Sequence, residues 1–437
     1  MFSVVENGWG YGSLTTHFSL LATIMRVELV VIGDEILAGR TVDTNSNYIA
    51  QGLLKLGLTP SMITVVPDAY SELAKALRNI ISRADIIITI GGLGPTPDDK
   101  TRESLAEALS RPLEENTEAA CMLMNYKVKN SVGYNKQVSM PEGSIALHNL
   151  VGIAPGIYIK TPEEKRIFSL PGVPNEMKAM FDNEVSRILE HEIKTTPSSV
   201  YLLRTTGICE IDLLKRLSDY PANLKEKIAF YPSYEGVDIR IVGDKEIYKK
   251  CKGLFSPYVY TEKELLLSEI VGNLLREKRA TLSCAESCSG GFLSSRIVDI
   301  PGASDYYLGG VVSYSNEAKM KTLGVDKELL EHYGAVSGEV AKNMAEGAKA
   351  NFGSNYALST TGIAGPTGGT QEKPIGLVFI ALARPNKPTY IRRYRFNGTR
   401  EMVRRKTVQA ALFLLFLELK ARLENFPFVD GSEEIVL

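Results

Sequence analysis

Residues 85–111 read DIIITIGGLGPTPDDKTRESLAEALSR, and this stretch decides the fold of the N-terminal part of the chain. Its first six residues form an apolar run typical of a parallel strand that is buried on both faces. A glycine-rich turn follows, and a helical pattern completes the stretch. The same alternation of strand and helix precedes it, at 26–32, 45–56, 61–66 and 71–83. This alternation predicts a doubly wound α/β domain that binds ligands at the carboxyl edge of its sheet.

Two further parts follow this domain. Residues 227–232 and 237–243 are strand patterns in direct succession, which predicts a small α+β module. Alternating patterns then resume and end in a long C-terminal helix, which predicts a second α/β domain. Met25 starts the first strand pattern, so we expect the native chain to begin there. Residues 1–24 are then an extension that is either wrongly included in the sequence or disordered. The other predicted parts are an α/β domain at 25–187, an α+β module at 188–262 and a second α/β domain at 263–437.

Composition and charge indicate a cytoplasmic protein without a nucleic-acid or membrane partner. The chain of 437 residues is 44% hydrophobic and 23% charged, as in ordinary globular proteins. Lys and Arg number 50, and Asp and Glu number 51, so no net field attracts nucleic acid or an anionic membrane. The apolar run at 410–417 is too short to span a bilayer. Five cysteines, odd in number and mostly far apart, fit a reducing compartment.

A serine-containing turn is the main candidate site of the C-terminal part. The sequence AESCSGG at 285–291 lies between a short strand and a helical pattern, which places Ser287 at a strand-to-helix turn. Unpaired main-chain N–H groups at such a turn can stabilise an oxyanion, and the two glycines allow close approach of a substrate. The spacing fits a simpler interpretation equally well, in which Ser287 and Ser289 only cap the helix. Cys288 is another candidate nucleophile, although buried structural cysteines are common.

A serine nucleophile needs a base, and the sequence offers a lysine. The four histidines lie outside any recognisable motif. Lys319 follows the strand pattern at 306–314, and a partly buried lysine can act as a neutral amine base. The alternative, which spacing alone favours, is a solvated lysine in the first turns of a helix.

A loop rich in glycine and hydroxyl groups suits a phosphate or a ribose. The sequence TTGIAGPTGGT at 360–370 follows another strand pattern, so this loop lies at the carboxyl end of a strand. Three arginines that open or line the last helix can supply the counter-charge. These arginines are Arg400, Arg404 and Arg405.

Three polar segments of the first domain meet at the carboxyl edge of its predicted sheet. Glycines that lead into a helix can cradle a pyrophosphate, and carboxylates can bind a divalent metal such as Mg²⁺. The candidate pyrophosphate contacts are Asn45, Gly91, Gly92, Gly94 and Thr96. The candidate metal ligands are Asp34, Asp98 and Asp99. Capping of the following helix by Asp98 or Asp99 is the simpler interpretation, and it is compatible with ligand binding.

Six motifs of the last part together resemble the C-terminal domain of the CinA family. They are AESCSGG, PGAS at 301–304, VVSYSNEAK at 311–319, GAVSGEVA at 334–341, TTGIAGPTGGT and KPIG at 373–376. The resemblance implies hydrolysis of nicotinamide mononucleotide to nicotinate mononucleotide and ammonia, without a cofactor. It also implies that Ser287 is the nucleophile, Lys319 the base and Tyr314 an active-site tyrosine. The positions that match the family's nucleotide contacts are Gly302, Ser304, Thr361 and Arg400.

The first domain resembles the molybdopterin-binding fold found at the N-terminus of CinA proteins. NKQ at 135–137, PEG at 141–143, VGIAPG at 151–156 and LPGVPNEM at 170–177 extend the match. The resemblance leaves two alternatives: a metal-dependent ADP-ribose pyrophosphatase, or a protein that binds a pterin or nucleotide without turnover.

The middle part resembles the family's KH-like insert. It lacks an evident basic GXXG loop around residues 207–210, where Glu210 has the wrong charge for phosphate. We therefore interpret this part as structural or dimer-forming and expect a homodimer. A different interpretation of the whole chain is a regulatory protein that binds pyridine nucleotides without turnover.

Overall fold

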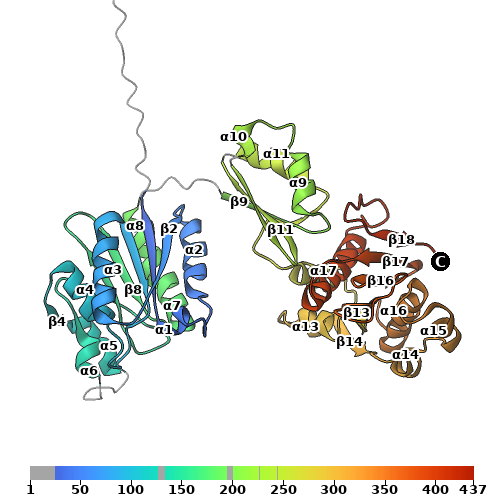
Figure 1. Ribbon diagram of the computed structural model, residues 1–437, viewed down its shortest axis with the longest axis horizontal. Helices are drawn as coiled ribbons and strands as arrows, with labels where there is room; N and C mark the ends of the chain where they lie inside the picture. The colour runs from blue at the N-terminus through green and yellow to red at the C-terminus, as the bar shows by residue number, and fades with distance from the viewer. Residues whose placement is uncertain (1–24, 126–132, 194–199, 226, 244) are drawn as a thin grey trace, which may run out of the picture. The chain divides into compact units, whose positions relative to one another are not determined.

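The computed structural model describes residues 25–125, 133–193, 200–225, 227–243 and 245–437 (Figure 1). The predicted extension, residues 1–24, lies outside the described residues. The chain divides into two compact units, Met1–Pro197 and Ser198–Leu437.

The first unit is built around a six-stranded sheet with the order β2-β1-β3-β8-β7-β6. Its first four strands are parallel, β7 is antiparallel to β8, and β6 is antiparallel to β7, so the sheet is mixed at one edge. In sequence order these strands are β1 (Val27–Ile32), β2 (Pro60–Val66), β3 (Ile86–Ile90), β6 (Ile145–Leu147), β7 (Gly156–Lys160) and β8 (Arg166–Leu170). Every residue of β1, β3 and β8 is buried, as the continuous apolar runs predict.

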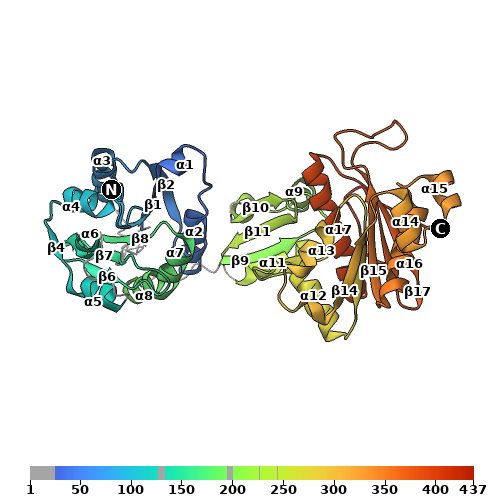
Figure 2. The same cartoon turned by 90° about the horizontal axis from the view of Figure 1, so that it is seen from below.

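Helices cover both faces of this sheet, each over its own hydrophobic core, so the predicted doubly wound arrangement is present (Figures 1 and 2). One face carries α2 (Asn45–Lys55), α7 (Pro174–Met180), a π-helical segment (Phe181–Val185) and α8 (Ser186–Glu192). The other carries α3 (Tyr70–Arg83), α4 (Thr101–Leu109) and α5 (Thr117–Asn125). The short elements are α1 (Asp34–Leu37), β4 (Leu113–Glu115), α6 (Tyr134–Val138) and β5 (Ser139–Pro141).

The second unit contains the C-terminal α/β domain, whose sheet has the order β14-β13-β15-β16-β17-β18. Its strands are β13 (Leu282–Glu286), β14 (Tyr307–Val312), β15 (Tyr356–Gly362), β16 (Leu377–Arg384), β17 (Lys387–Arg395) and β18 (Glu433–Ile435). Strands β13, β14 and β15 are parallel, and each of β16, β17 and β18 is antiparallel to the strand before it. One face packs against α14 (Asn316–Leu323), α15 (Lys327–Tyr333) and α16 (Gly338–Phe352). The other packs against α12 (Leu267–Glu277), α13 (Phe292–Val298) and α17 (Arg400–Leu419).

The middle module belongs to the same unit and has a four-stranded antiparallel sheet with the order β10-β11-β9-β12. Its elements are β9 (Val200–Thr205), α9 (Glu210–Arg216), α10 (Ala222–Lys225), β10 (Ile228–Ser233), β11 (Gly236–Val242), α11 (Lys245–Phe255) and β12 (Val259–Thr261). The two strand patterns predicted in succession thus form the β10–β11 hairpin. The predicted α+β character is present.

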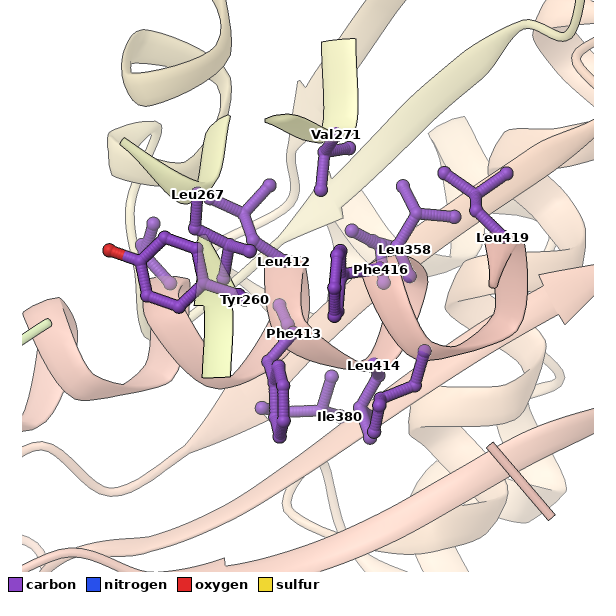
Figure 3. Close-up of a cluster of buried hydrophobic side chains, with 14 of the residues drawn as sticks. Tyr260, Leu267, Val271, Leu358, Ile380, Leu412, Phe413, Leu414, Phe416 and Leu419 are labelled. Carbon is purple, nitrogen blue, oxygen red and sulfur yellow. The ribbon is translucent and has the colours of Figure 1, made fainter. Parts of the chain in front are cut away.

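One hydrophobic core joins the middle module to the C-terminal domain. Figure 3 shows Tyr260 of β12 beside Leu267 of α12 and Leu412 and Phe413 of α17. At Gly207, which follows β9, an added Cβ would lie 2.6 Å from Cε1 of Phe413. The turn at residues 207–210, which lacks an evident basic GXXG loop, is therefore packed against α17.

The apolar run at 410–417 lies in α17 and is buried in this core. Among the residues described, no helix combines the length and the apolar character needed to cross a membrane.

Candidate active site

Ser287 lies at the carboxyl edge of the C-terminal sheet, in the turn between β13 and α13. Its main-chain N–H donates to the carbonyl oxygen of Thr360 on β15 at 2.9 Å, which fixes the turn between two strands. Gly290 and Gly291 have φ values of 60° and 88°, a region that favours glycine. In the described part of the chain, their N–H groups have no hydrogen-bond acceptor. The turn therefore offers main-chain donors to an oxyanion.

The simpler interpretation of this turn, a serine cap, is wrong. The residue at the N-cap of α13 is Gly291, and no side chain caps the helix from that position. The carboxylate of Glu286 instead accepts the hydrogen bonds of N–H groups at the start of α13. It is fully buried and accepts hydrogen bonds from the N–H groups of Leu293 and Ser294 at 3.0 and 2.8 Å. Charge-assisted bonds of this kind satisfy N–H groups that a helix start leaves unpaired.

Glu286 also accepts from two hydroxyl groups, those of Ser289 at 2.7 Å and Ser294 at 2.6 Å. The hydroxyl of Ser289 lies 2.6 Å from that of Thr360. The carboxylate thus holds the turn, the helix and β15 together around Ser287. Sequence reasoning missed this role, although a carboxylate directly before a glycine-rich turn and a helix was an available signal.

Glu286→Ala is expected to lower the free energy of unfolding by about 3 kcal/mol, because it leaves several buried donors without an acceptor. Urea denaturation of the full chain measures this change. Glu317→Ala, which removes an exposed carboxylate from the first turn of α14, is the matched control and is expected to change it by less than about 0.5 kcal/mol. Equal losses in the two variants would contradict this role for Glu286.

Lys319 reaches Ser287 from α14, and its side chain is only 1% exposed. Its Nζ lies 3.1 Å from Oγ of Ser287, 2.8 Å from the carbonyl oxygen of Ser313 and 3.4 Å from that of Tyr314. A neutral amine has two N–H groups and one lone pair. The two carbonyls can accept the N–H groups, which leaves the lone pair for the hydroxyl of Ser287.

Burial lowers the pKa of Lys319 because the charged ammonium loses its hydration, although the neighbouring Cys288 opposes this shift. The expectation that spacing alone favoured, a solvated lysine, is wrong. The structure brings the predicted nucleophile and the predicted base into hydrogen-bonding distance of each other.

Cys288 is poorly suited to be the nucleophile. Its side chain is buried, and burial raises the pKa of its thiol to about 12. Because the thiolate is the reactive form, this thiol is inert near neutral pH. Ser287 remains the candidate nucleophile of the turn.

Arginines from the start of α17 connect the other loops of the site. Arg400 donates to the phenolic oxygen of Tyr314 at 3.0 Å and to the carbonyl oxygen of Gly365 at 2.9 Å. Arg404 donates twice to the carbonyl oxygen of Ser289, at 3.1 and 2.8 Å. The glycine-rich loop, the exposed Tyr314 and the Ser287 turn therefore converge on one end of α17.

Thr361 lies at the same edge, but its hydroxyl is committed to the fold. The side chain is buried, and Oγ1 donates to the carbonyl oxygen of Ala335 at 2.7 Å. The hydroxyl of Thr361 thus joins β15 to the segment that precedes α16.

Gly302 and Ser304 do not join the Ser287 cluster within one copy of the chain, and their role as nucleotide contacts stays a prediction. They precede β14, whereas Ser287 follows β13, and these two strands are parallel. Helix α13 carries the chain back across the sheet between them, so the two sites lie at opposite edges, about 16 Å apart along β13. Gly302 has φ 76°, a backbone conformation that favours glycine, which is a structural reason for this residue.

The predicted loops of the first unit do come together, around a cavity of about 710 Å³. Gly91, Gly92 and Gly94 line it. Asn45 lies beside this cavity and donates to the carbonyl oxygen of Gly172, another lining residue, at 2.7 Å. Thr96 donates its N–H to Asp99 at 2.9 Å. Helix α4 begins only at Thr101, after the N-cap Lys100, so neither Asp98 nor Asp99 caps it.

The predicted metal ligands Asp98 and Asp99 line this cavity, and Asp34 lies beside it next to Asp68, so the metal site stays a prediction. The described residues contain no group of three or more histidines, cysteines, aspartates or glutamates placed to hold a metal ion. Asp99 instead accepts from Thr96, and Asp68 accepts the main-chain N–H of Asp34 at 3.0 Å. Burial raises the pKa of Asp68. The carboxylate-bearing residues that line the cavity are Glu35, Asp68, Asp98, Asp99 and Glu176.

Three family models match the chain, in the predicted order. They are described as "Probable molybdopterin binding domain" over residues 28–191, "Damage-inducible protein CinA KH domain" over 201–272 and "CinA C-terminal domain" over 265–419. The predicted fold class is thereby confirmed. The predicted domain bounds stay predictions.

Similar proteins cover nearly the whole chain. A protein of Halothermothrix orenii, provisionally named competence-damage inducible protein, is 39% identical over 91% of this chain and 99% of its own. A CinA-like protein of Desulfovibrio desulfuricans is 36% identical over 93% of this chain and 99% of its own. The crystal structure of competence/damage inducible protein CihA from Agrobacterium tumefaciens is 37% identical, with a TM-score of 0.34, and covers 35% of this chain and 93% of that chain.

Proposed function

Because the chain belongs to the CinA family, we propose that its C-terminal domain hydrolyses the carboxamide of nicotinamide mononucleotide to nicotinate mononucleotide and ammonia. The observation that supports this best is the contact between Ser287 and Lys319, in which a buried amine with a lowered pKa lies 3.1 Å from a serine hydroxyl. A hydroxyl beside a neutral amine is a nucleophile with its base. The substrate class itself rests on the family resemblance.

The first step forms an acyl-enzyme. Lys319 accepts the hydroxyl proton while Oγ of Ser287 bonds to the carboxamide carbon, and the carbonyl oxygen becomes an oxyanion. The N–H groups of Gly290 and Gly291, which have no acceptor among the described residues, are main-chain donors of the turn that can stabilise this charge. The carbon–nitrogen bond then breaks, and the nitrogen leaves as ammonia with the proton that Lys319 returns.

The second step releases the acid. Lys319 takes a proton from water while the water oxygen attacks the ester carbon, and Ser287 recovers its proton as the ester bond breaks. Tyr314 is exposed and held by Arg400, so its ring offers a flat surface to the planar pyridine of the substrate. None of these steps uses a cofactor.

An ammonia-release assay on nicotinamide mononucleotide with the full chain tests the proposal. We expect stoichiometric formation of ammonia and nicotinate mononucleotide, and none from nicotinate mononucleotide itself. Binding of nicotinamide mononucleotide without ammonia release would support the alternative, a regulatory protein without turnover.

We propose no activity for the cavity of the first unit. Among the residues that the structure describes, its lining includes five carboxylate side chains and no lysine or arginine, which disfavours a pyrophosphate. A bound pyrophosphate would need a cation to offset that charge, and the described residues contain no group of three or more histidines, cysteines, aspartates or glutamates placed to hold one. The pyrophosphatase alternative therefore gains no support from this geometry. The expected homodimer remains a proposal, and light scattering of the full chain tests it.

A further inference from the structure

A second cavity lies beside the Ser287 turn and is basic. Its volume is about 450 Å³, and Phe292 of α13 forms part of its wall. The other lining residues all come from the first turns of α17 and are Arg400, Glu401, Arg404 and Arg405. Since Arg404 also binds the carbonyl oxygen of Ser289, this cavity adjoins the turn that holds the nucleophile.

The charges around this cavity do not balance. Arg405 pairs with Glu401 at 2.9 Å. Neither Arg400 nor Arg404 has a carboxylate within ion-pair distance among the residues that the structure describes. Three guanidinium groups thus face one carboxylate, which leaves two positive charges at a small cavity. This excess suits a phosphomonoester, which carries about two negative charges at neutral pH.

The middle module contributes to the same place through the turn of its β10–β11 hairpin. The guanidinium carbon of Arg405 lies 5.6 Å from the ring centre of Tyr234 and 5.4 Å from that of Phe292. Tyr234 is at the hairpin turn, and Phe292 is in α13. Two aromatic rings from different parts of the unit therefore orient one arginine of the cavity.

The hairpin turn is itself fixed to the C-terminal domain. Glu235 accepts a hydrogen bond on its carbonyl oxygen from Gln409 of α17 at 2.6 Å. Its carboxylate pairs with Arg296 of α13 and, at 3.5 Å, with Arg204 of β9. Tyr234 is thus held against Arg405 by neighbouring bonds and by the shared core shown in Figure 3.

We propose that this cavity binds the phosphate group of the nucleotide substrate, and that Tyr234 of the middle module is a positioning residue for Arg405. The middle module is then a part of the substrate site and not only a structural insert. This inference deepens the proposed function and rests on it for the identity of the substrate.

Binding of inorganic phosphate to the full chain, measured by calorimetry, tests the subsite without any turnover. We expect Arg405→Ala to weaken binding about tenfold or more and Tyr234→Ala to weaken it about threefold to tenfold, while Tyr234→Phe retains it because the ring remains. Tyr231→Ala, an exposed tyrosine of the same hairpin, is the matched control and is expected to have no effect. Thermal melting of each variant shows whether it is folded.

Kinetics provide the second measurement. Tyr234→Ala should raise KM for nicotinamide mononucleotide severalfold with little change in kcat, and should leave KM for nicotinamide riboside, which lacks the phosphate, unchanged. Unchanged phosphate binding in folded Arg405→Ala and Tyr234→Ala would overturn the inference. Phosphate binding that responds as expected in a chain without ammonia release would uphold the subsite and reject the amidohydrolase.

Discussion

Replacement of Ser287 by alanine is expected to lower kcat for ammonia release by about 10⁴-fold or more, because the described part of the turn offers no second reactive nucleophile. The neighbouring Cys288 is a protonated, buried thiol. The main-chain bond from Ser287 to Thr360 does not involve the lost hydroxyl, so the fold of the turn should persist. The measurement is single-turnover and steady-state release of ammonia from nicotinamide mononucleotide.

The control for this variant is Ser295→Ala, which removes an exposed hydroxyl from α13, the helix that follows the turn. It should leave kcat within about twofold of the original value. A Ser287→Ala protein that is folded and keeps more than a tenth of the activity would exclude the covalent mechanism. A mechanism in which Lys319 activates water directly, without an acyl-enzyme, would then explain the activity better.

The parts of the site that were predictable from sequence are those that depend on local order along the chain. A short strand pattern that ends at Ala285, followed by a turn with two glycines and a helical pattern, placed Ser287 at the carboxyl edge of a sheet. That placement depends only on the direction of one strand. The same logic gathered the polar loops of the first unit around one cavity.

The parts that were not predictable depend on which side chains meet across elements. Spacing alone favoured a solvated Lys319, and only the packing of α14 against the sheet shows that its amine is buried. The metal site expected at Asp34, Asp98 and Asp99 stays a prediction for a related reason. Asp34 and Asp98 lie close enough to act electrostatically on Asp68, whereas Asp99 accepts from Thr96, and spacing along the chain does not show which of these carboxylates meet.

Gly302 and Ser304 show a different limit. A family motif identifies positions but not the edge of the sheet on which they lie. The parallel register of β13 and β14 places these residues at the edge opposite Ser287. If they contact substrate, a second copy of the chain has to supply them, which connects their role to the proposed homodimer.

The pH dependence of the reaction follows from the state of Lys319. Only the neutral amine can accept the proton of Ser287, and burial disfavours the ammonium form, so the pKa of Lys319 is lower than the usual 10.5. Below that pKa the amine is protonated and inactive. We therefore expect kcat/KM to rise with pH along a single ionisation whose pKa is below 10.5, and to level off above it.

Replacement of Lys319 by alanine should lower kcat by about 10³-fold or more and remove this ionisation from the pH profile, since among the described residues only Lys319 lies within hydrogen-bonding distance of the Ser287 hydroxyl. Added primary amines should restore part of the rate, because the cavity left by the side chain can admit a small neutral base. Lys321→Ala, an exposed lysine of the same helix, is the matched control and should change neither the rate nor the profile. A Lys319→Ala protein that keeps the rising profile of the original would show that another group accepts the proton, and the buried amine would then have only a structural role in α14.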